Sequence, residues 1–269
     1  MKALSRSYML VVFALLYAPI LVLVVFSFND GGTLSSYTGF SLRWYGELFR
    51  DRVALQSLKN SLLLALGSSA IATLIGTFAA LGLDRMKQRT LKGAITSVTN
   101  IPMMNPDIVT GVSMMLLFVA LAGILQLDNI LGRWTMLIAH VTFSLPYVIL
   151  SILPRFRQFD NTLREAALDL GCTPTRSFFK VELPSILPGI VSGFVMGFTL
   201  SLDDFVISHF VSSPDFQTLP LYIYNQTAHN VKYSMYALCT LIIVAILALL
   251  LAVNFAGGIG KGKKKEGTK

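Results

Sequence analysis

Six long apolar stretches constrain this chain more than any other feature of its sequence. An α-helix needs about 20 mostly apolar residues to cross the hydrocarbon core of a bilayer. The stretches are Tyr8 to Phe28, Leu58 to Leu83, a stretch within Ala94 to Leu125, Leu131 to Leu153, Ile186 to Val211, and Met235 to Phe255. The sequence therefore predicts an all-α integral membrane protein with six transmembrane helices.

Composition agrees with this fold class and excludes a soluble one. Only 13% of the 269 residues are charged and 54% are hydrophobic, whereas a soluble domain carries roughly 25% charged residues. We expect one transmembrane domain over residues 1–256, followed by a basic tail over residues 257–269. The tail is rich in glycine and lysine, so we expect it to be disordered and to contact anionic lipid.

The distribution of basic residues predicts the orientation in the membrane. If the N-terminus lies inside, sixteen of the 22 Lys and Arg residues fall in inside segments and six in outside segments. Because inside loops carry the excess of positive charge, both termini and the loop of about residues 154–185 are predicted to be cytoplasmic. The net charge of +8 thus follows the membrane topology, and no nucleic-acid partner is predicted.

Sequence patterns of catalysis and of metal binding are missing from this chain. No H-E-x-x-H or G-x-S-x-G pattern occurs, and the three histidines show no ligand spacing. The nearest approach to a phosphate-binding loop has Lys264 where Ser or Thr is required, and it follows a membrane helix instead of a strand. We therefore predict no catalytic residue, no metal, no cofactor and no ATP hydrolysis by this chain.

The loop between the fourth and fifth stretches contains a short amphipathic pattern. Leu163, Ala166, Ala167 and Leu170 recur at helical spacing and predict one apolar face on a short helix. Gly171 follows, where a helix commonly ends in a left-handed cap. Such a helix could be an ordinary solvated or interfacial one, or it could enter a groove on a partner protein.

The spacing of this loop resembles one family signature, which is EAA, three residues, G, nine residues, I, one residue, LP. That signature marks the membrane subunits of binding-protein-dependent ABC importers, at the site where the ATPase docks. Val181 replaces the isoleucine, and the other positions fit. The matching residues, which the resemblance assigns to ATPase coupling, are Glu165, Ala166, Ala167, Gly171, Val181, Leu183 and Pro184.

Three carboxylates in or at the ends of apolar stretches are candidate substrate-path residues: Asp107, Asp203 and Asp204. Ionisable groups in membrane helices usually face a bundle interior or a water-filled path. Asp107 could instead be a helix N-cap, and the pair could be an interfacial cap. The fifth stretch contains no lysine or arginine, so we interpret the pair as unpaired and suited to a cationic substrate.

Further segments resemble the spermidine/putrescine permeases, and most closely the C-type subunit. They include residues 16–20, 27–29, 43–45, 105–109 and 198–206. The resemblance implies a type I ABC importer permease in the plasma (inner) membrane that forms half of a polyamine path. It also implies a second permease subunit, an ATPase dimer and an extracytoplasmic binding protein. A permease for another solute, such as iron or phosphonate, and a secondary transporter are the alternatives.

Overall fold

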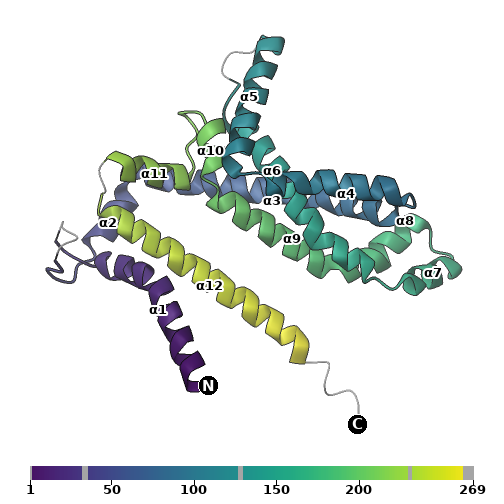
Figure 1. The fold of residues 1–269 in the computed structure, drawn as a ribbon, viewed down its shortest axis with the longest axis horizontal. Helices are drawn as coiled ribbons and strands as arrows, with labels where there is room; N and C mark the ends of the chain where they lie inside the picture. Colours follow the sequence, from purple (N-terminus) through teal and green to yellow (C-terminus); the bar gives the residue numbers. More distant parts are fainter. Residues whose placement is uncertain (1, 32–35, 127–129, 230–231, 263–269) are drawn as a thin grey trace. The chain divides into compact units, whose positions relative to one another are not determined.

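The computed structural model describes residues 2–31, 36–126, 130–229 and 232–262, and these residues are almost entirely helical (Figure 1). Their only strand-type pairings are two isolated bridges. The helices are α1 (Lys2–Phe26), α2 (Arg43–Arg50), α3 (Arg52–Arg85), α4 (Arg89–Met104), α5 (Asp107–Leu125), α6 (Arg133–Arg157), α7 (Asn161–Asp169), α8 (Pro174–Ser177), the π-helix η1 (Phe178–Glu182), α9 (Leu183–Asp203), α10 (Val206–Val211), α11 (Leu219–His229) and α12 (Ser234–Gly262). The predicted all-helical class is confirmed.

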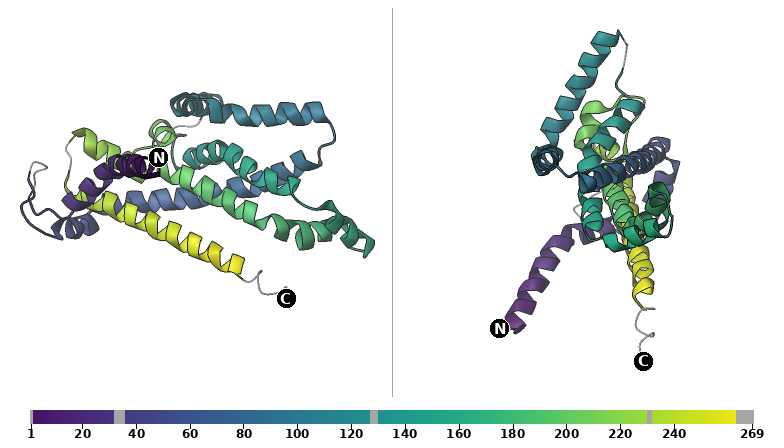
Figure 2. Two further views of the ribbon diagram at one scale, coloured as in Figure 1. Left: turned by 60° about the horizontal axis from the view of Figure 1, so that its bottom comes forward. Right: turned by 90° about the vertical axis from the view of Figure 1, so that its right-hand side faces the viewer.

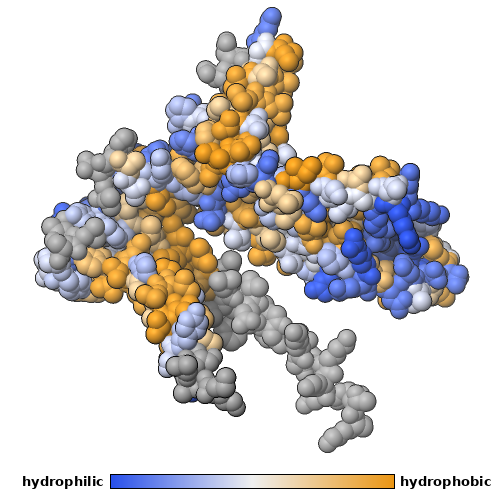
Figure 3. All heavy atoms as spheres, viewed as in Figure 1, coloured by the Kyte–Doolittle hydropathy of each residue, from blue (hydrophilic) through white to orange (hydrophobic). Residues whose placement is uncertain are grey.

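Among the described residues, five helical segments are long and apolar enough to cross a membrane. They are Arg6–Phe26, Arg52–Arg85, Asp107–Leu125, Arg133–Arg157 and Pro174–Asp203. The sixth predicted stretch lies in α12, in which the described apolar segment, Ser234–Ala248, is shorter. Their exposed surfaces are strongly apolar, as on α5, where Leu117 and Ile124 are 63% and 78% exposed (Figure 3).

Two predicted stretches are interrupted, and the last helix extends into the segment predicted to be a tail. The third stretch breaks at Asn105–Pro106, so that α4 ends at Met104 and α5 starts at Asp107. The fifth stretch breaks after Asp203, and α10 forms a separate helix. Helix α12 continues to Gly262, into the segment expected to be disordered, and residues 263–269 lie outside the described part. The single transmembrane domain of residues 1–256 stays a prediction.

The chain divides into two compact units, residues 1–55 with 223–269 and residues 56–222. In the first unit, α12 packs against α1 and α2. Trp44 of α2 is buried; its indole Nε1 donates to the Asn29 carbonyl oxygen at 2.6 Å, and its ring lies 5.2 Å from that of Tyr233. These contacts connect α2 to the segment that follows α1 and to the residue that precedes α12.

In the second unit, the closest helix pair is α6 and α9, which lie side by side (Figures 1 and 2). Gly189, Gly193 and Gly197 form a stripe of small residues along α9. A Cβ atom added at Gly193 would lie 3.3 Å from side-chain atoms of Ile152 and Val148 on α6. Because the glycines lack side chains, the α6 side chains reach the α9 backbone, as is common in membrane helix pairs.

Candidate functional site

The candidate coupling loop, residues 158–182, begins with a well-defined helix start at α7. Asp160 is the N-cap residue, and its Oδ1 accepts hydrogen bonds from the Thr162 amide at 3.0 Å and the Thr162 hydroxyl at 2.8 Å. Those two bonds, of which the hydroxyl bond has the larger effect, hold the pKa of Asp160 below its usual value. The cap satisfies backbone N–H groups that would otherwise lack a partner at the helix start.

The other end of α7 depends on Gly171. Its φ angle is +83°, in the left-handed region. The amide of Gly171 donates to the Leu168 carbonyl at 2.9 Å, and that of Cys172 donates to the Ala167 carbonyl at 3.0 Å. These two bonds are those of the Schellman motif. The predicted left-handed cap at Gly171 is therefore confirmed.

Helix α7 turns one apolar residue inward and leaves others uncovered. Ala167 is buried, whereas Leu163 and Leu170 are 50% and 86% exposed. Ala166 and Glu165 are also exposed. The short helix thus presents leucine side chains to its surroundings on a part of the molecule that is otherwise strongly hydrophilic (Figure 3). We interpret these exposed leucines as a candidate protein interaction surface.

The loop returns to the membrane helices through α8 and a π-helical turn. The Thr173 hydroxyl oxygen accepts from the Arg176 amide at 3.3 Å, and Pro174 occupies the first position of α8. Val181 lies half-buried within η1, and Leu183 and Pro184 are the first two residues of α9. The sequence pattern did not predict the π-helical turn, a feature that often marks functional sites.

An ion pair that sequence reasoning missed connects this loop to α3. Nη2 of Arg85, in the last turn of α3, lies 2.8 Å from both carboxylate oxygens of Glu182. The Glu182 side chain is only 4% exposed, whereas that of Arg85 is 42% exposed. The guanidinium carbon of Arg85 also lies 6.0 Å from the Phe178 ring centre. Glu182 is the variable position of the family signature, so the signature carried no indication of its role.

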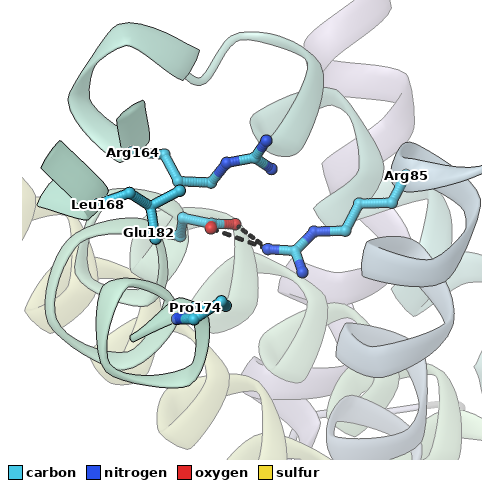
Figure 4. Close-up of a pocket in the computed structure, with 5 residues that line it drawn as sticks. All are labelled: Arg85, Arg164, Leu168, Pro174 and Glu182. Carbon is cyan, nitrogen blue, oxygen red and sulfur yellow. Dashed lines mark hydrogen bonds and ion pairs between the residues drawn. The ribbon is translucent and has the colours of Figure 1, made fainter. Parts of the chain in front are cut away.

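The ion pair forms one wall of a pocket of about 260 Å³ (Figure 4). Arg164 and Leu168 of α7 and Pro174 of α8 complete its lining. The Arg164 side chain extends over the pocket beside Glu182, but no ion pair of Arg164 occurs in the part of the chain that the structure describes. Two guanidinium groups therefore line one pocket, and the Glu182 carboxylate pairs with that of Arg85.

Asp107 is exposed at the start of α5, and it is not the N-cap. Pro106 occupies that position, and the cap makes no side-chain hydrogen bond. The N-cap interpretation of Asp107 was therefore wrong by one residue. Its carboxylate still lies in the first turn, where a negative charge interacts favourably with the helix dipole.

The acidic pair divides into two different environments at the α9–α10 break. Asp203 is exposed as the last residue of α9, and no hydrogen bond or ion pair involves it among the described residues. The side chain of Asp204 is 6% exposed. Its Oδ2 accepts from the Ser208 amide at 2.8 Å, and its Oδ1 accepts from the Ile207 amide at 3.2 Å. For Asp204, these bonds fit the alternative interpretation of the acidic pair, in which the residue caps a helix end.

Asp204 also has a basic neighbour, which corrects the expectation that the pair is unpaired. His140 Nε2, from α6, lies 3.5 Å from Asp204 Oδ2, and the histidine is fully buried. The prediction depended on the residues of the fifth stretch alone, whereas His140 lies on another helix. The available signal was a histidine in the middle of an apolar stretch, since such residues rarely lack a role.

The structure brings the two acidic segments to one region of the second unit. Asp107 lies one turn before Gly111, and a Cβ atom added at Gly111 would lie 3.0 Å from the Phe210 ring and 3.4 Å from the Val206 carbonyl oxygen. Helices α5 and α10 therefore pack together near the acidic pair. The coupling residues form a separate group at the junction of α7, η1 and α9.

Comparison with known proteins gives consistent matches over most of the chain. The family "Binding-protein-dependent transport system inner membrane component" matches residues 72–256. The "Putrescine transport system permease protein PotI" of Escherichia coli (strain K12) is 41% identical over 234 residues, covering 87% of this chain and 83% of the relative. The "Spermidine/putrescine transport system permease protein PotC" of Haemophilus influenzae is 41% identical over 247 residues, covering 92% and 93%.

Solved structures show the same fold at low sequence identity. A chain of a bacterial alginate ABC transporter, in complex with an alginate pentasaccharide-bound periplasmic protein, superposes with a TM-score of 0.71 at 17% identity, and 99% of both chains is covered. A chain of a bacterial ABC transporter involved in alginate import has a TM-score of 0.72 at 14% identity, covering 96% of this chain and 95% of that one.

Proposed function

Because this chain belongs to the binding-protein-dependent transport system inner membrane components, the permeases of ABC importers, we propose that it forms half of a translocation path for spermidine or putrescine. It is a non-catalytic, multi-pass inner-membrane subunit, and a separate ATPase hydrolyses ATP. The observation that carries the substrate proposal is 41% identity, over about nine tenths of the chain, to permeases named for these polyamines. In this proposal a second permease subunit completes the path.

The coupling loop is proposed to bind the ATPase dimer. The exposed Leu163 and Leu170 side chains on α7 support this role, because they form an apolar surface outside the apolar spans. Glu165 and Ala166 lie on the same exposed helix. The remaining members of the signature shape the loop: Ala167 packs inward, Gly171 ends the helix, and Val181, Leu183 and Pro184 lead into α9.

Asp203 and Asp107 are proposed to line the polyamine path. Polyamines are cationic at neutral pH, and carboxylates on a path attract cations and raise their local concentration. Both carboxylates are exposed in the single chain, and α5 packs against α10 beside the acidic pair. Asp204 was also predicted as a path residue, but its carboxylate is already used by two backbone amides and His140. We therefore assign it a supporting role.

The uptake of labelled polyamine tests this proposal. We expect Asp203→Asn and Asp107→Asn, in the complete importer, to reduce spermidine uptake at low substrate concentration by roughly tenfold each, because a charge-assisted contact is worth about 1.5–3 kcal/mol. Asp215→Asn is the matched control, since Asp215 is exposed in the α10–α11 loop, and it should transport normally. Normal spermidine uptake by both path variants would contradict the path role of the two carboxylates. Equal competition by an unrelated solute would contradict the polyamine assignment.

The orientation follows from the charge distribution and is proposed with both termini and the coupling loop in the cytoplasm. A cysteine at Gln88, an exposed residue between α3 and α4, should resist a membrane-impermeant thiol reagent in intact cells and react after lysis. The experiment uses a background in which Cys172 and Cys239 are serine. Asp215→Cys is the control and should react in intact cells. The opposite labelling pattern would reverse the topology.

A further inference from the structure

A buried polar cluster occupies the break between α9 and α10. It brings together residues from four helices and the linking segment: Ser68 of α3, His140 of α6, Ser201 of α9, Asp204 of the link and Ser208 of α10. His140, Ser68 and Ser208 are fully buried, and Ser201 is 4% exposed. Polar side chains in such a setting are costly unless they satisfy one another.

The hydrogen bonds of the cluster form a continuous chain. The Ser68 hydroxyl donates to Ser201 Oγ at 2.9 Å. Ser201 Oγ lies 2.7 Å from His140 Nδ1 and accepts from Ser68, so its own hydrogen is directed to that nitrogen. Nε2 is then the ring nitrogen that carries the hydrogen, and it lies 3.3 Å from Ser208 Oγ and 3.5 Å from Asp204 Oδ2. The same carboxylate also accepts a hydrogen bond from the Ser208 amide.

The position of this series of hydrogen bonds in the fold explains how it stabilises the backbone at the α9–α10 break. The polypeptide leaves helical geometry at Asp204, whose φ and ψ are −66° and 121°, and α10 starts at Val206. The first amides of α10 have no partner within their helix. Asp204 supplies acceptors for two of them, and His140 holds the carboxylate from α6. The break is therefore fixed by side chains from outside the α9 segment.

We propose that His140 and Asp204, supported by Ser201 and Ser208, form a latch that holds the α9–α10 break and thereby positions the Asp203 carboxylate. Asp203 is the last residue of α9 and directly precedes the anchored Asp204. Consecutive residues of a helix point about 100° apart, so anchoring Asp204 inward directs Asp203 away from the cluster. His140 is a positioning residue and does not itself contact the polyamine. The substrate part of this inference rests on the function proposed above.

The test compares local opening of the break with apparent substrate affinity in the complete importer. A reporter cysteine at Val206, in a background without Cys172 and Cys239, is labelled with a water-soluble thiol reagent, and the Michaelis constant for spermidine uptake is measured. We expect His140→Leu and Asp204→Asn to raise both the labelling rate and the Michaelis constant about tenfold or more. The double variant should add little, because both changes break one interaction.

Conservative and neighbouring substitutions separate the latch from simple loss of folding. His140→Gln keeps an N–H donor for Asp204, so it should restore most of the protection at Val206. If His140→Leu is absent from the membrane, Asp204→Asn and Ser208→Ala carry the test, with a smaller rise expected for Ser208→Ala. Asp215→Asn is the control and should change neither quantity.

Different results would overturn the latch and the substrate role of Asp203. Wild-type labelling and a wild-type Michaelis constant in both His140→Leu and Asp204→Asn would overturn the latch. Asp203→Asn should raise the Michaelis constant without changing the labelling of Val206. If the latch variants open the break and Asp203→Asn leaves the Michaelis constant unchanged, the latch is supported and the substrate role of Asp203 is overturned.

Discussion

Gly171→Val is expected to abolish transport while the protein still inserts into the membrane. The φ angle of +83° at Gly171 is unfavourable for any residue with a Cβ atom, by roughly 1–2 kcal/mol, and a β-branched side chain is the least suited. No atom outside the loop lies within 4 Å of a Cβ atom added there. The expected defect is therefore one of backbone conformation and not of crowding.

Three substitutions at this position form a matched series. Asparagine adopts the left-handed region more readily than other residues with side chains, so Gly171→Asn should retain most transport, Gly171→Ala less, and Gly171→Val almost none. The measurements are recovery of the ATPase with the purified permease and ATP-driven spermidine uptake by that complex. A Val variant that binds the ATPase and transports at the wild-type rate would show that the α7 cap has no part in coupling.

Arg85→Ala is expected to produce the second large effect, because it leaves the carboxylate of Glu182 buried without its charge partner. Loss of one partner of such a pair typically costs several kcal/mol. Since the Arg85 side chain is 42% exposed, we expect a smaller cost of about 1–3 kcal/mol. The effect should appear as a lower midpoint of thermal unfolding and as lower transport, because the pair attaches η1 to α3.

The different exposure of Arg85 and Glu182 provides the control variants. Glu182→Gln should be milder, since the freed Arg85 guanidinium can turn toward water, and Arg85→Ala with Glu182→Gln should recover part of the lost stability. Arg164→Ala removes a second guanidinium from the same pocket and should leave the unfolding midpoint near that of the wild type. Equal midpoints for Arg85→Ala and Arg164→Ala would contradict a stabilising role for the ion pair.

The local sequence was sufficient to predict a structural feature wherever that feature depends on residues close together along the chain. The apolar stretches predicted the membrane helices, and Gly171 after an amphipathic segment predicted the left-handed cap. Asn105 and Pro106 lie at the break between α4 and α5, where proline cannot continue the preceding helix. In each case the responsible residues lie within one or two helical turns, which is the range over which propensity and capping act.

Pairings between distant residues could not be predicted in this way. Glu182 and Arg85 are 97 residues apart in sequence, and His140 meets Asp204 from another helix. Without knowledge of which helices pack together, Asp204 was interpreted as an unpaired charge in an apolar stretch. The packing of α6 against α9 and α10 supplies that information, because it places His140 beside Asp204.

The glycine stripe on α9 has a mechanical consequence for the coupling loop. The loop leaves from the end of α6 and returns at the start of α9, so both of its attachment points belong to the same tightly packed pair. Along the stripe, Val148 and Ile152 of α6 reach the α9 backbone at Gly193, and sliding one helix past the other would break these contacts. A displacement of the loop would therefore move α6 and α9 together as one rigid pair and would not move either helix separately.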